Sequence, residues 1–213
     1  MFFKKNKTMP DKISTQRDAI RQQVRSARKA LSVKEQQQAS LQLLMSLINH
    51  PKVSQAQHLS LTLAYDGEID LTPFIHWCWQ QQKQLYLPVV HPTKTGHLLF
   101  IAYKPDTQMI KNRYGIDEPK LSSTSTNTTP AHALDIVLTP LVAFDPQGNR
   151  IGMGGGYYDR LLAPWFTEKQ GPYPIGLAHD CQYVSTLPIQ EWDVPLPEVI
   201  TPSQHYYFSE FEI

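Results

Sequence analysis

Long apolar runs are missing from this chain of 213 residues, and cysteine is nearly missing. No segment approaches the ~20 apolar residues of a membrane-spanning helix. The opening MFFKKNKTMPDK has only a short apolar patch, too little for a secretory signal. The two cysteines, Cys78 and Cys181, have no CxxC or Cys/His spacing around them, which argues against a disulfide framework or a zinc site. We therefore expect a cytoplasmic protein.

An excess of charge of either sign is missing too, because 20 Lys+Arg stand against 19 Asp+Glu. A chain so balanced has no general attraction to nucleic acid or to an anionic membrane, so any anion site must be local. The length suits one domain with a sizeable core. We expect a flexible leader over residues 1–12, a single domain over 13–213 and a monomer.

The first periodic segment predicts a helix over residues 13–31. Its apolar stripe is formed by Ile20, Val24, Ala27 and Leu31. The stripe beside it is formed by Arg17, Arg21, Arg25 and Arg28. Like charges at i,i+4 repel each other, so an arginine stripe next to the buried face suggests an anion nearby. The alternative is a solvated basic face.

The remaining segments alternate between helix and strand patterns. SVKE at 32–35 is a capping box for a helix that runs to about Asn49, and Thr72 before Pro73 marks another helix start. Strand patterns occur in HLSLTLAY, QLYLPVV, HLLFIAY, LDIVLTPLVAF, PIGLAH and EVIT. This alternation predicts an α/β domain with a largely parallel sheet. The Ser/Thr/Asn-rich tract at 121–132 predicts a surface loop within that domain.

Three consecutive glycines follow the strand pattern IVLTPLVAF and precede YYDRLLAPWF, which suits a helix. At such a turn the backbone N–H groups and the helix dipole form an anion site, for which phosphate is the natural ligand. There is no Gly-Lys-Ser/Thr, and Tyr157 replaces the last glycine of GxGxxG, so the chain is neither a P-loop NTPase nor a standard dinucleotide binder. A tight turn needed for packing alone is the alternative.

Charged residues on both sides of the glycines favour the phosphate interpretation. The planar fork of Arg150 can hold phosphate oxygens. Asp159 lies three residues after the last glycine, where it can balance the helix dipole or hold Mg²⁺ together with substrate phosphates. A magnesium site would need a second carboxylate from elsewhere in the chain.

With these residues in view, GNRIGMGGGYYDR at 148–160, followed by GLAHDCQYVSTLPIQEWDVPLPEVIT, resembles the 5-formyltetrahydrofolate cyclo-ligases, also called methenyltetrahydrofolate synthetases. The resemblance extends from the arginine helix to residue 201 and includes LTLAYDGEID and NRYGIDEPKL. It implies a single three-layer α/β/α domain with a largely parallel, Rossmann-like sheet. It also implies an enzyme that uses Mg²⁺ and ATP to convert 5-formyltetrahydrofolate into 5,10-methenyltetrahydrofolate, ADP and phosphate, by phosphorylation of the formyl oxygen and attack by N10.

The same resemblance implies the roles of individual residues. The implied ATP-binding residues are Arg17, Arg21, Arg150, Ile151, Gly152, Met153, Gly154, Gly155, Gly156, Tyr157 and Tyr158. The implied folate-binding residues are Leu63, Glu68, Gly154, Gly155, Gly156 and Tyr157. Asp159 and Asp193 are the implied metal ligands, and Arg150 and Tyr157 the implied catalytic residues. Some members have Lys where Arg17 and Gly155 stand, so here Arg150 and the backbone amides would carry more of the phosphate charge.

Several of these residues also have a purely structural interpretation. Asp193 suits a turn or a helix cap, and Glu68 suits a solvated loop. Tyr157 is of a type that often packs in the core, and Tyr158 more so. The histidines, such as His91 and His179, are expected to be incidental.

Two rival functions remain open at the level of sequence. One is a non-catalytic folate- or nucleotide-binding module on the same fold, and the other a sugar-phosphate isomerase or transferase on a related fold. Two metal carboxylates beside a phosphate loop favour an enzyme over a pure binder.

Overall fold

A central sheet organises the computed structural model, which describes residues 12–112, 115–120 and 128–208. In spatial order its strands are β12 (His205–Tyr207), β11 (Glu198–Ile200), β10 (Tyr173–Leu177), β7 (Ile136–Pro140), β1 (His58–Ser60), β2 (Gln84–Val90), β3 (Leu98–Tyr103) and β6 (Thr128–Thr129). Neighbouring strands from β11 to β2 run parallel, and antiparallel pairing is confined to the two edges. The predicted largely parallel sheet is confirmed.

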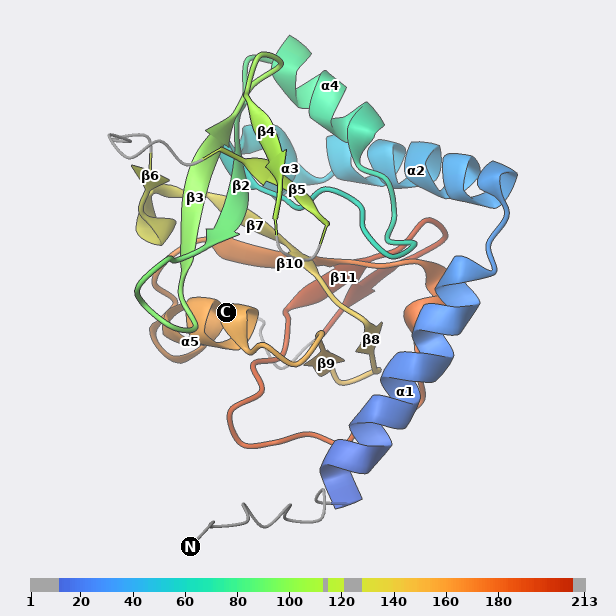
Figure 1. Ribbon diagram of the computed structural model, residues 1–213. Coiled ribbons are helices and arrows are strands. Elements are labelled where there is room, and N and C mark those ends of the chain that lie inside the picture. Colours follow the sequence, from blue (N-terminus) through green and yellow to red (C-terminus); the bar gives the residue numbers. More distant parts are fainter. Residues whose placement is uncertain (1–11, 113–114, 121–127, 209–213) are drawn as a thin grey trace, which may run out of the picture.

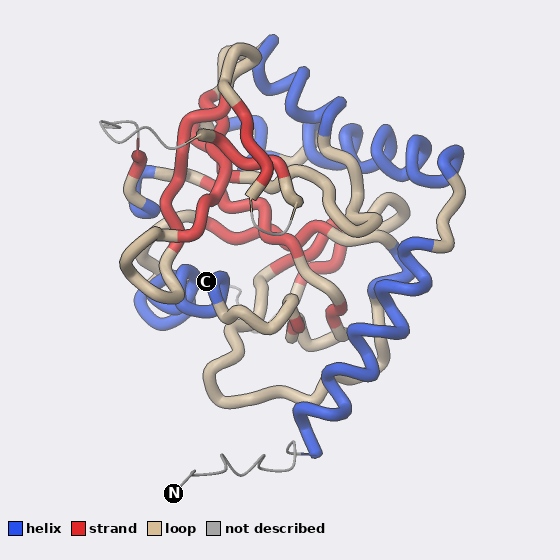
Figure 2. The backbone as a smooth tube through the Cα atoms, viewed as in Figure 1, coloured by secondary structure: helices blue, strands red, loops and turns tan. Residues whose placement is uncertain are grey.

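Helices cover both faces of this sheet (Figures 1 and 2). One face carries α2 (Val33–Ile48), α3 (Pro51–Gln55) and α4 (Thr72–Gln80), and the other carries α5 (Tyr157–Glu168). Side chains of successive strand residues point to opposite faces. Accordingly Ile136 and Leu138 pack in the cluster under α2–α4, whereas Val137 between them packs with Leu161 of α5. The arrangement is the expected three-layer α/β/α fold.

Local signals predicted the first helices well. The helix expected over 13–31 is α1 (Lys12–Lys29). Of the leader expected over 1–12, residues 1–11 lie outside the described part of the chain. The capping box before α2 is confirmed, since Ser32 Oγ accepts from the Glu35 N–H and Glu35 Oε2 accepts from the Ser32 N–H at 2.7 Å. Helix α4 begins at Thr72, but its N-cap residue is Leu71, so Pro73 stands one position further into the helix than expected.

The long strand predictions were only partly right. HLSLTLAY forms a strand over His58–Ser60 alone, because from residue 61 onward the chain leaves the sheet. LDIVLTPLVAF divides into β7 and β8 (Ala143–Phe144), and β8 pairs with β9 (Arg150–Ile151) in a separate ladder. Through this second ladder the chain passes from the central sheet to residues 152–156, called here the glycine stretch.

Smaller elements complete the described structure. Strands β4 (Met109–Lys111) and β5 (Asp117–Pro119) pair with each other, and η2 (Asp180–Gln182) follows β10. Of the loop expected over 121–132, residues 121–127 lie outside the described residues. The rest is not simple loop, because β6 pairs with the edge of β3 and η1 (Ala131–Ala133) follows. None of the helices described is both long and apolar enough to cross a bilayer.

Helix α1 lies beside the sheet and contacts β8 and η2 (Figure 1). Val24 is buried on its inner side, but Ala27, placed by the sequence pattern on the apolar stripe, is exposed. Arg28 is buried instead, with 1% of its surface exposed. The alternative of a solvated basic face is therefore wrong: part of the arginine stripe faces inward, since distant segments supply its partners.

Candidate active site

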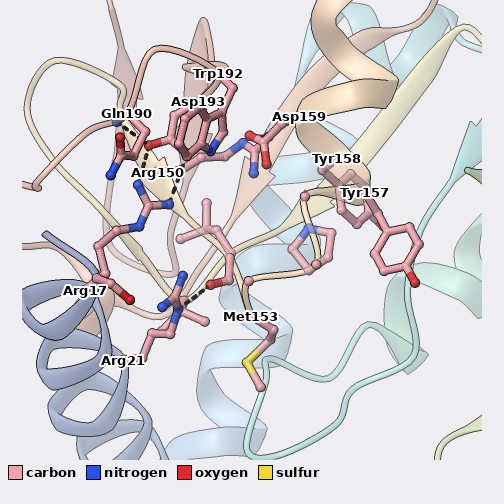
Figure 3. Close-up of a pocket in the computed structure, with 18 of the residues that line it drawn as sticks. Arg17, Arg21, Arg150, Met153, Tyr157, Tyr158, Asp159, Gln190, Trp192 and Asp193 are labelled. Atoms are coloured by element: carbon pink, nitrogen blue, oxygen red, sulfur yellow. Dashed lines mark hydrogen bonds and ion pairs between the residues drawn. The ribbon is translucent and has the colours of Figure 1, made fainter. Parts of the chain in front are cut away.

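A cavity of ≈ 470 Å³ opens where β7 ends, between α1, the glycine stretch and the segment 188–193 (Figure 3). In a parallel α/β sheet, ligands bind beyond the carboxyl ends of the strands, which is where this cavity lies. It is lined by Ser14, Arg17, Arg21, Glu68, Pro140, Leu141, Val142, Arg150, Gly152, Met153, Gly154, Gly155, Gly156, Tyr157, Tyr158, Asp159, Gln190, Trp192 and Asp193. The structure thus brings together most of the residues singled out in the sequence.

The hairpin before the glycine stretch is fixed by a buried carboxylate. Asp145 accepts backbone N–H bonds from Gln147 and Asn149 and also from Leu187, in the segment that leads to Asp193. The same side chain therefore positions β9, which carries Arg150, and the start of the opposite wall of the cavity.

The glycine stretch joins β9 to α5, as predicted. Gly154 and Gly156 have φ of 96° and 63°, in the left-handed region where glycine carries no Cβ penalty. Gly156 is the N-cap residue of α5 and offers no side-chain hydrogen bond to the first turn. The first N–H groups of a helix have no partner within it, so this uncapped end can donate to an anion in the cavity.

Two arginines hold the carbonyl groups of this stretch. Arg21 Nε donates to the carbonyl of Gly152 at 2.8 Å, and Arg160 Nη2 donates to that of Gly155 at 2.6 Å. Arg160 also donates to the carbonyl of Gly96, which ties the stretch to the loop between β2 and β3. The glycine stretch is therefore held from α1 on one side and from α5 on the other.

Arg150 lies at the centre of the charged part of the cavity. It is 4% exposed, and its Nη2 donates to Asp159 Oδ1 at 2.8 Å. Its Nε has no hydrogen-bond partner among the described residues. Burial lowers the pKa of Arg150, and the nearby charges of Asp159 and Asp193 act against that shift. A buried guanidinium with an unused donor at a cavity wall is suited to bind an anionic ligand.

Asp193 faces Arg150 from the C-terminal segment. Arg17 forms a two-pronged ion pair with it, in which Nη2 lies 3.0 Å from Oδ1, and Arg17 also donates to the carbonyl of Pro188. The Gln190 N–H donates to Asp193 Oδ2 at 2.8 Å, so Asp193 also has the turn role considered from sequence. Figure 3 shows Arg17, Gln190 and Asp193 on the side of the cavity away from Tyr157.

Glu68 and the two tyrosines form the opposite part. Burial raises the pKa of Glu68, while Arg28 and the Tyr65 N–H, which donates to Oε2 at 3.3 Å, act against that shift. Tyr158 packs against the core and lines the cavity, and its buried hydroxyl has no hydrogen-bond partner in the part of the chain that the structure describes. The ring of Tyr157 has Arg160 near its face, with 5.7 Å between Cζ and the ring centroid. This end offers aromatic surface and a carboxyl group of raised pKa.

Two predicted site residues do not line the cavity. Leu63 packs against the core cluster under α2–α4, and Ile151 is buried against α1. Apolar side chains next to buried strands are drawn into the core, so Ile151 can offer a ligand only its backbone.

Sequence reasoning missed Ser14, Gln190, Trp192 and Arg160. Trp192 is 67% exposed although it is large and apolar, and it lines the cavity next to Asp193. Its position beside a candidate metal ligand in EWDVPL was the one signal that the sequence contained.

A second group of chemically active side chains lies outside the cavity. Nε2 of His50 and of His205 lie 3.0 and 2.5 Å from Glu198 Oε2, which resembles a metal-ligand set. However, Nδ1 of His50 accepts the Val53 N–H at 3.3 Å, so the proton of the neutral ring is on Nε2, directed at Glu198. Metal-bound histidines usually donate from their other ring nitrogen. The geometry fits a buried hydrogen-bonded cluster better than a metal centre.

Comparisons with known proteins agree with the geometry. A family model described as the 5-formyltetrahydrofolate cyclo-ligase family matches residues 13–202. The 5-formyltetrahydrofolate cyclo-ligase of Escherichia coli is 45% identical over 181 residues, which cover 85% of this chain and 97% of that protein. The cyclo-ligase of Haemophilus influenzae is 44% identical over 184 residues, with 86% and 96% covered. Among solved structures, the 5,10-methenyltetrahydrofolate synthetase of Aquifex aeolicus superposes with a TM-score of 0.75 at 26% identity, covering 92% of this chain and 95% of that chain.

Proposed function

Because this chain belongs to the 5-formyltetrahydrofolate cyclo-ligase family, we propose that it converts 5-formyltetrahydrofolate and ATP into 5,10-methenyltetrahydrofolate, ADP and phosphate, with Mg²⁺ required. Family membership favours a ligase over the binding module and the isomerase left open by the sequence. The observation that carries the proposal is that Arg150, Asp159 and the uncapped start of α5 meet in one cavity with Glu68.

The proposed reaction activates an unreactive amide. The formyl oxygen attacks the γ-phosphorus of ATP and ADP leaves, which gives an iminium phosphate. N10 then attacks the formyl carbon, the C–O bond to phosphate breaks, and the N10 proton departs with the phosphate. Phosphoryl transfer needs positioning and charge neutralisation more than covalent help from the protein. The cavity supplies these through arginines and backbone amides, and no nucleophilic side chain is needed.

The nucleotide end of the cavity is formed by α1 and the glycine stretch. Arg17 and Arg21 reach it from α1, and Arg150 reaches it from β9. We assign the phosphates of ATP to the start of α5, where backbone N–H groups and the unused Nε of Arg150 can donate to their oxygens. Since Gly155 carries no side chain, these donors take the place of the lysine that some members have there.

The donor set at this end fits a magnesium ion. Asp159 and Asp193 both line the cavity and both act on Arg150. Within the described residues, the hydrogen bonds to Asp159 end on Oδ1, which leaves Oδ2 to bind a cation. Mg²⁺ in such sites takes one or two carboxylates together with substrate phosphates. When bound, it would neutralise the charge of the transferring phosphoryl group.

We assign the folate to the other end. The carboxyl group of Glu68 can hydrogen-bond the amino-pyrimidine edge of the pterin, and the ring of Tyr157 offers a flat apolar face. With folate and phosphates at opposite ends, Arg150 lies between them, where the phosphoryl group is transferred from ATP to the formyl oxygen. We propose that Arg150 and Tyr157 act there as catalytic residues and that the enzyme works as a monomer.

A spectrophotometric assay tests the proposal. Purified protein is given 5-formyltetrahydrofolate, Mg²⁺ and ATP, and the near-ultraviolet absorbance of the methenyl product is followed, with ATP or Mg²⁺ omitted in the controls. We expect an absorbance rise that needs both, together with one ADP per product. A folded protein that binds both ligands but forms no product would overturn the proposal and leave a binding module.

A further inference from the structure

The C-terminal half of α1 binds the chain segment that carries Glu68 through ion pairs with Asp66. Arg25 Nε donates to Asp66 Oδ2 at 2.6 Å, and Lys29 is ion-paired with the other carboxylate oxygen. Arg28 contacts both the backbone carbonyl and the carboxylate of Asp66, so it makes more contacts with Asp66 than Arg25 or Lys29 does. Neither Arg25 nor Arg28 lines the cavity, in contrast to Arg17 and Arg21 at the other end of the helix.

Arg28 is the most buried cation in this contact. Its Nε and Nη2 donate to the backbone carbonyl of Asp66 at 3.0 and 2.8 Å, and Nη2 lies 3.2 Å from Asp66 Oδ2. Its Nη1 lies 3.8 Å from Glu68 Oε1 and has no hydrogen-bond partner within residues 12–112, 115–120 and 128–208. One guanidinium therefore binds the backbone of Asp66, the side chain of Asp66 and, by charge, the carboxyl group of Glu68.

The segment bound by Arg28 forms a tight turn. Asp66 and Gly67 both have positive φ, 54° and 78°, and the Glu68 N–H donates to the Tyr65 carbonyl at 3.0 Å. Two successive residues with positive φ and this hydrogen bond define a type I′ turn. Asp-Gly is a dipeptide that suits a type I′ turn, so the local sequence forms the turn, and contacts from outside it fix its place relative to the cavity.

The turn also fits closely against α1. A Cβ at Gly67 would lie 3.5 Å from the backbone carbonyl carbon and oxygen of Arg28. The carbonyl of Gly67 accepts from Gln36 of α2 at 3.2 Å. These contacts hold the turn in place relative to α1. The position of the turn in turn sets the direction in which the Glu68 side chain points.

The charges facing Arg28 are consistent with a fixed ion cluster. Hydrogen bonding from Arg25 lowers the pKa of Asp66 to about 2, although burial acts against it. Burial, followed by the charge of Arg28, lowers the pKa of His179 to about 4. His179 is thus neutral at pH 7, and it adds no positive charge beside Arg28.

We propose that Arg28 is a positioning residue for the folate: by holding both the carbonyl and the carboxylate of Asp66, it fixes the turn that directs Glu68 into the cavity. The proposal rests on the proposed function, since Glu68 is assigned to the folate there. Arg28 touches no reacting group, so its removal should affect the folate and leave the nucleotide end intact.

The test compares Arg28→Gln with Arg25→Gln, which removes an equal charge from the same stripe and from the same carboxylate. With wild-type activity established first, we expect Arg28→Gln to raise KM for 5-formyltetrahydrofolate by about tenfold or more, as loss of a buried charged hydrogen bond would do, and Arg25→Gln by less than about threefold. KM for ATP should stay within about twofold of wild type in both. Equal folate effects in the two variants, or an ATP effect as large as the folate effect, would overturn the proposal.

A double variant tests whether Arg28 acts through Glu68. In a Glu68→Gln background, Arg28→Gln should add little to the folate defect, because residues that act through one contact are not additive. Full additivity would contradict the proposed route.

Gly67→Ala approaches the same turn without altering α1, in case Arg28→Gln does not fold. An alanine at φ 78° is strained, so the turn should shift and KM for folate should rise while KM for ATP holds. An unchanged KM for folate in folded Gly67→Ala would count against the proposal. An inactive wild-type enzyme would instead refute the proposed function itself.

Discussion

The ring of Tyr157 lies against the backbone of Gly155, so closely that a Cβ at position 155 would be 2.6 Å from Tyr157 Cε2. Gly155 is not in the left-handed region, unlike Gly154 and Gly156, so the ring rather than the backbone requires glycine there. Any side chain at 155 must displace Tyr157. A lysine at 155, as in some members of the family, is therefore incompatible with the position that the Tyr157 ring has here.

This relationship predicts the behaviour of Gly155→Ala. The extra methyl group should push the Tyr157 ring from its place and raise KM for 5-formyltetrahydrofolate about tenfold, with little change in Tm, because the ring is only partly buried. In a Tyr157→Ala background the same substitution should have almost no further effect. Steady-state kinetics of the four proteins measures this coupling, and independent effects of the two substitutions would refute it.

Removal of the candidate metal carboxylates should abolish most of the turnover. Asp159→Asn keeps an acceptor for Arg150 and Val194 but lowers the charge, so we expect kcat to fall by about 10²-fold or more while Tm changes little. Asp193→Asn should behave similarly and also weaken the ion pair with Arg17. The apparent Mg²⁺ requirement should increase in both. Asp117→Asn, at an exposed ion pair with Lys111, is the matched control and should match wild type.

Trp192 should report nucleotide binding directly. Of the four tryptophans, it alone lines the cavity, and 67% of it is exposed. Mg·ATP should therefore change the intrinsic fluorescence of the wild type, and Trp192→Phe should lose that signal while it still binds. Trp192→Ala should weaken ATP by about fivefold or more if the ring stacks on the base. A full fluorescence response in Trp192→Phe would place the nucleotide elsewhere.

The cluster at Glu198 predicts how stability depends on pH. Burial alone would raise the pKa of Glu198, but hydrogen bonds from His205 and His50 prevail and lower it to about 2. A carboxyl group with a depressed pKa stabilises the folded state above its ordinary pKa, and that contribution is lost as pH falls toward 2. The free energy of unfolding should therefore decrease as pH falls below about 5.

Glu198→Gln should remove this part of the pH dependence. The variant should be less stable at pH 7 and show a shallower decline in denaturant unfolding between pH 5 and pH 3. Glu168→Gln, at an exposed position, serves as the control. If the Glu198→Gln curve runs parallel to wild type over this range, Glu198 is not the responsible group.

Features with local causes were the ones that the sequence could predict. The capping box at Ser32 and the placing of Asp159 in the first turn of α5 depend on residues three or four positions apart. The buried face of α1 could not be predicted in this way. Arg28 is buried because Asp66 lies opposite it, and no periodicity within residues 13–31 contains that information.

The candidate site likewise contains residues that a local sequence pattern predicts and residues that it does not. The glycine stretch and Arg150 were found from their own pattern, because a strand-to-helix turn is a local motif. Trp192 and Gln190 line the cavity only because the segment after residue 187 folds back toward α1. Leu63, which the family resemblance assigns to the folate, packs against the core cluster and does not line this cavity. The His50, Glu198 and His205 cluster joins three positions that share no sequence signal.

Helix α1 has a further consequence for the order in which the molecule assembles. Its arginines contact Asp66, the carbonyl of Gly152 and Asp193, and the last of these contacts spans 176 residues of the chain. Contacts between such distant positions close late in folding, because the intervening loop must first be ordered. The two walls of the cavity therefore become aligned only when these distant parts of the chain have met. Catalytic activity regained during refolding should trail the return of secondary structure, which makes turnover a strict indicator of the completed fold.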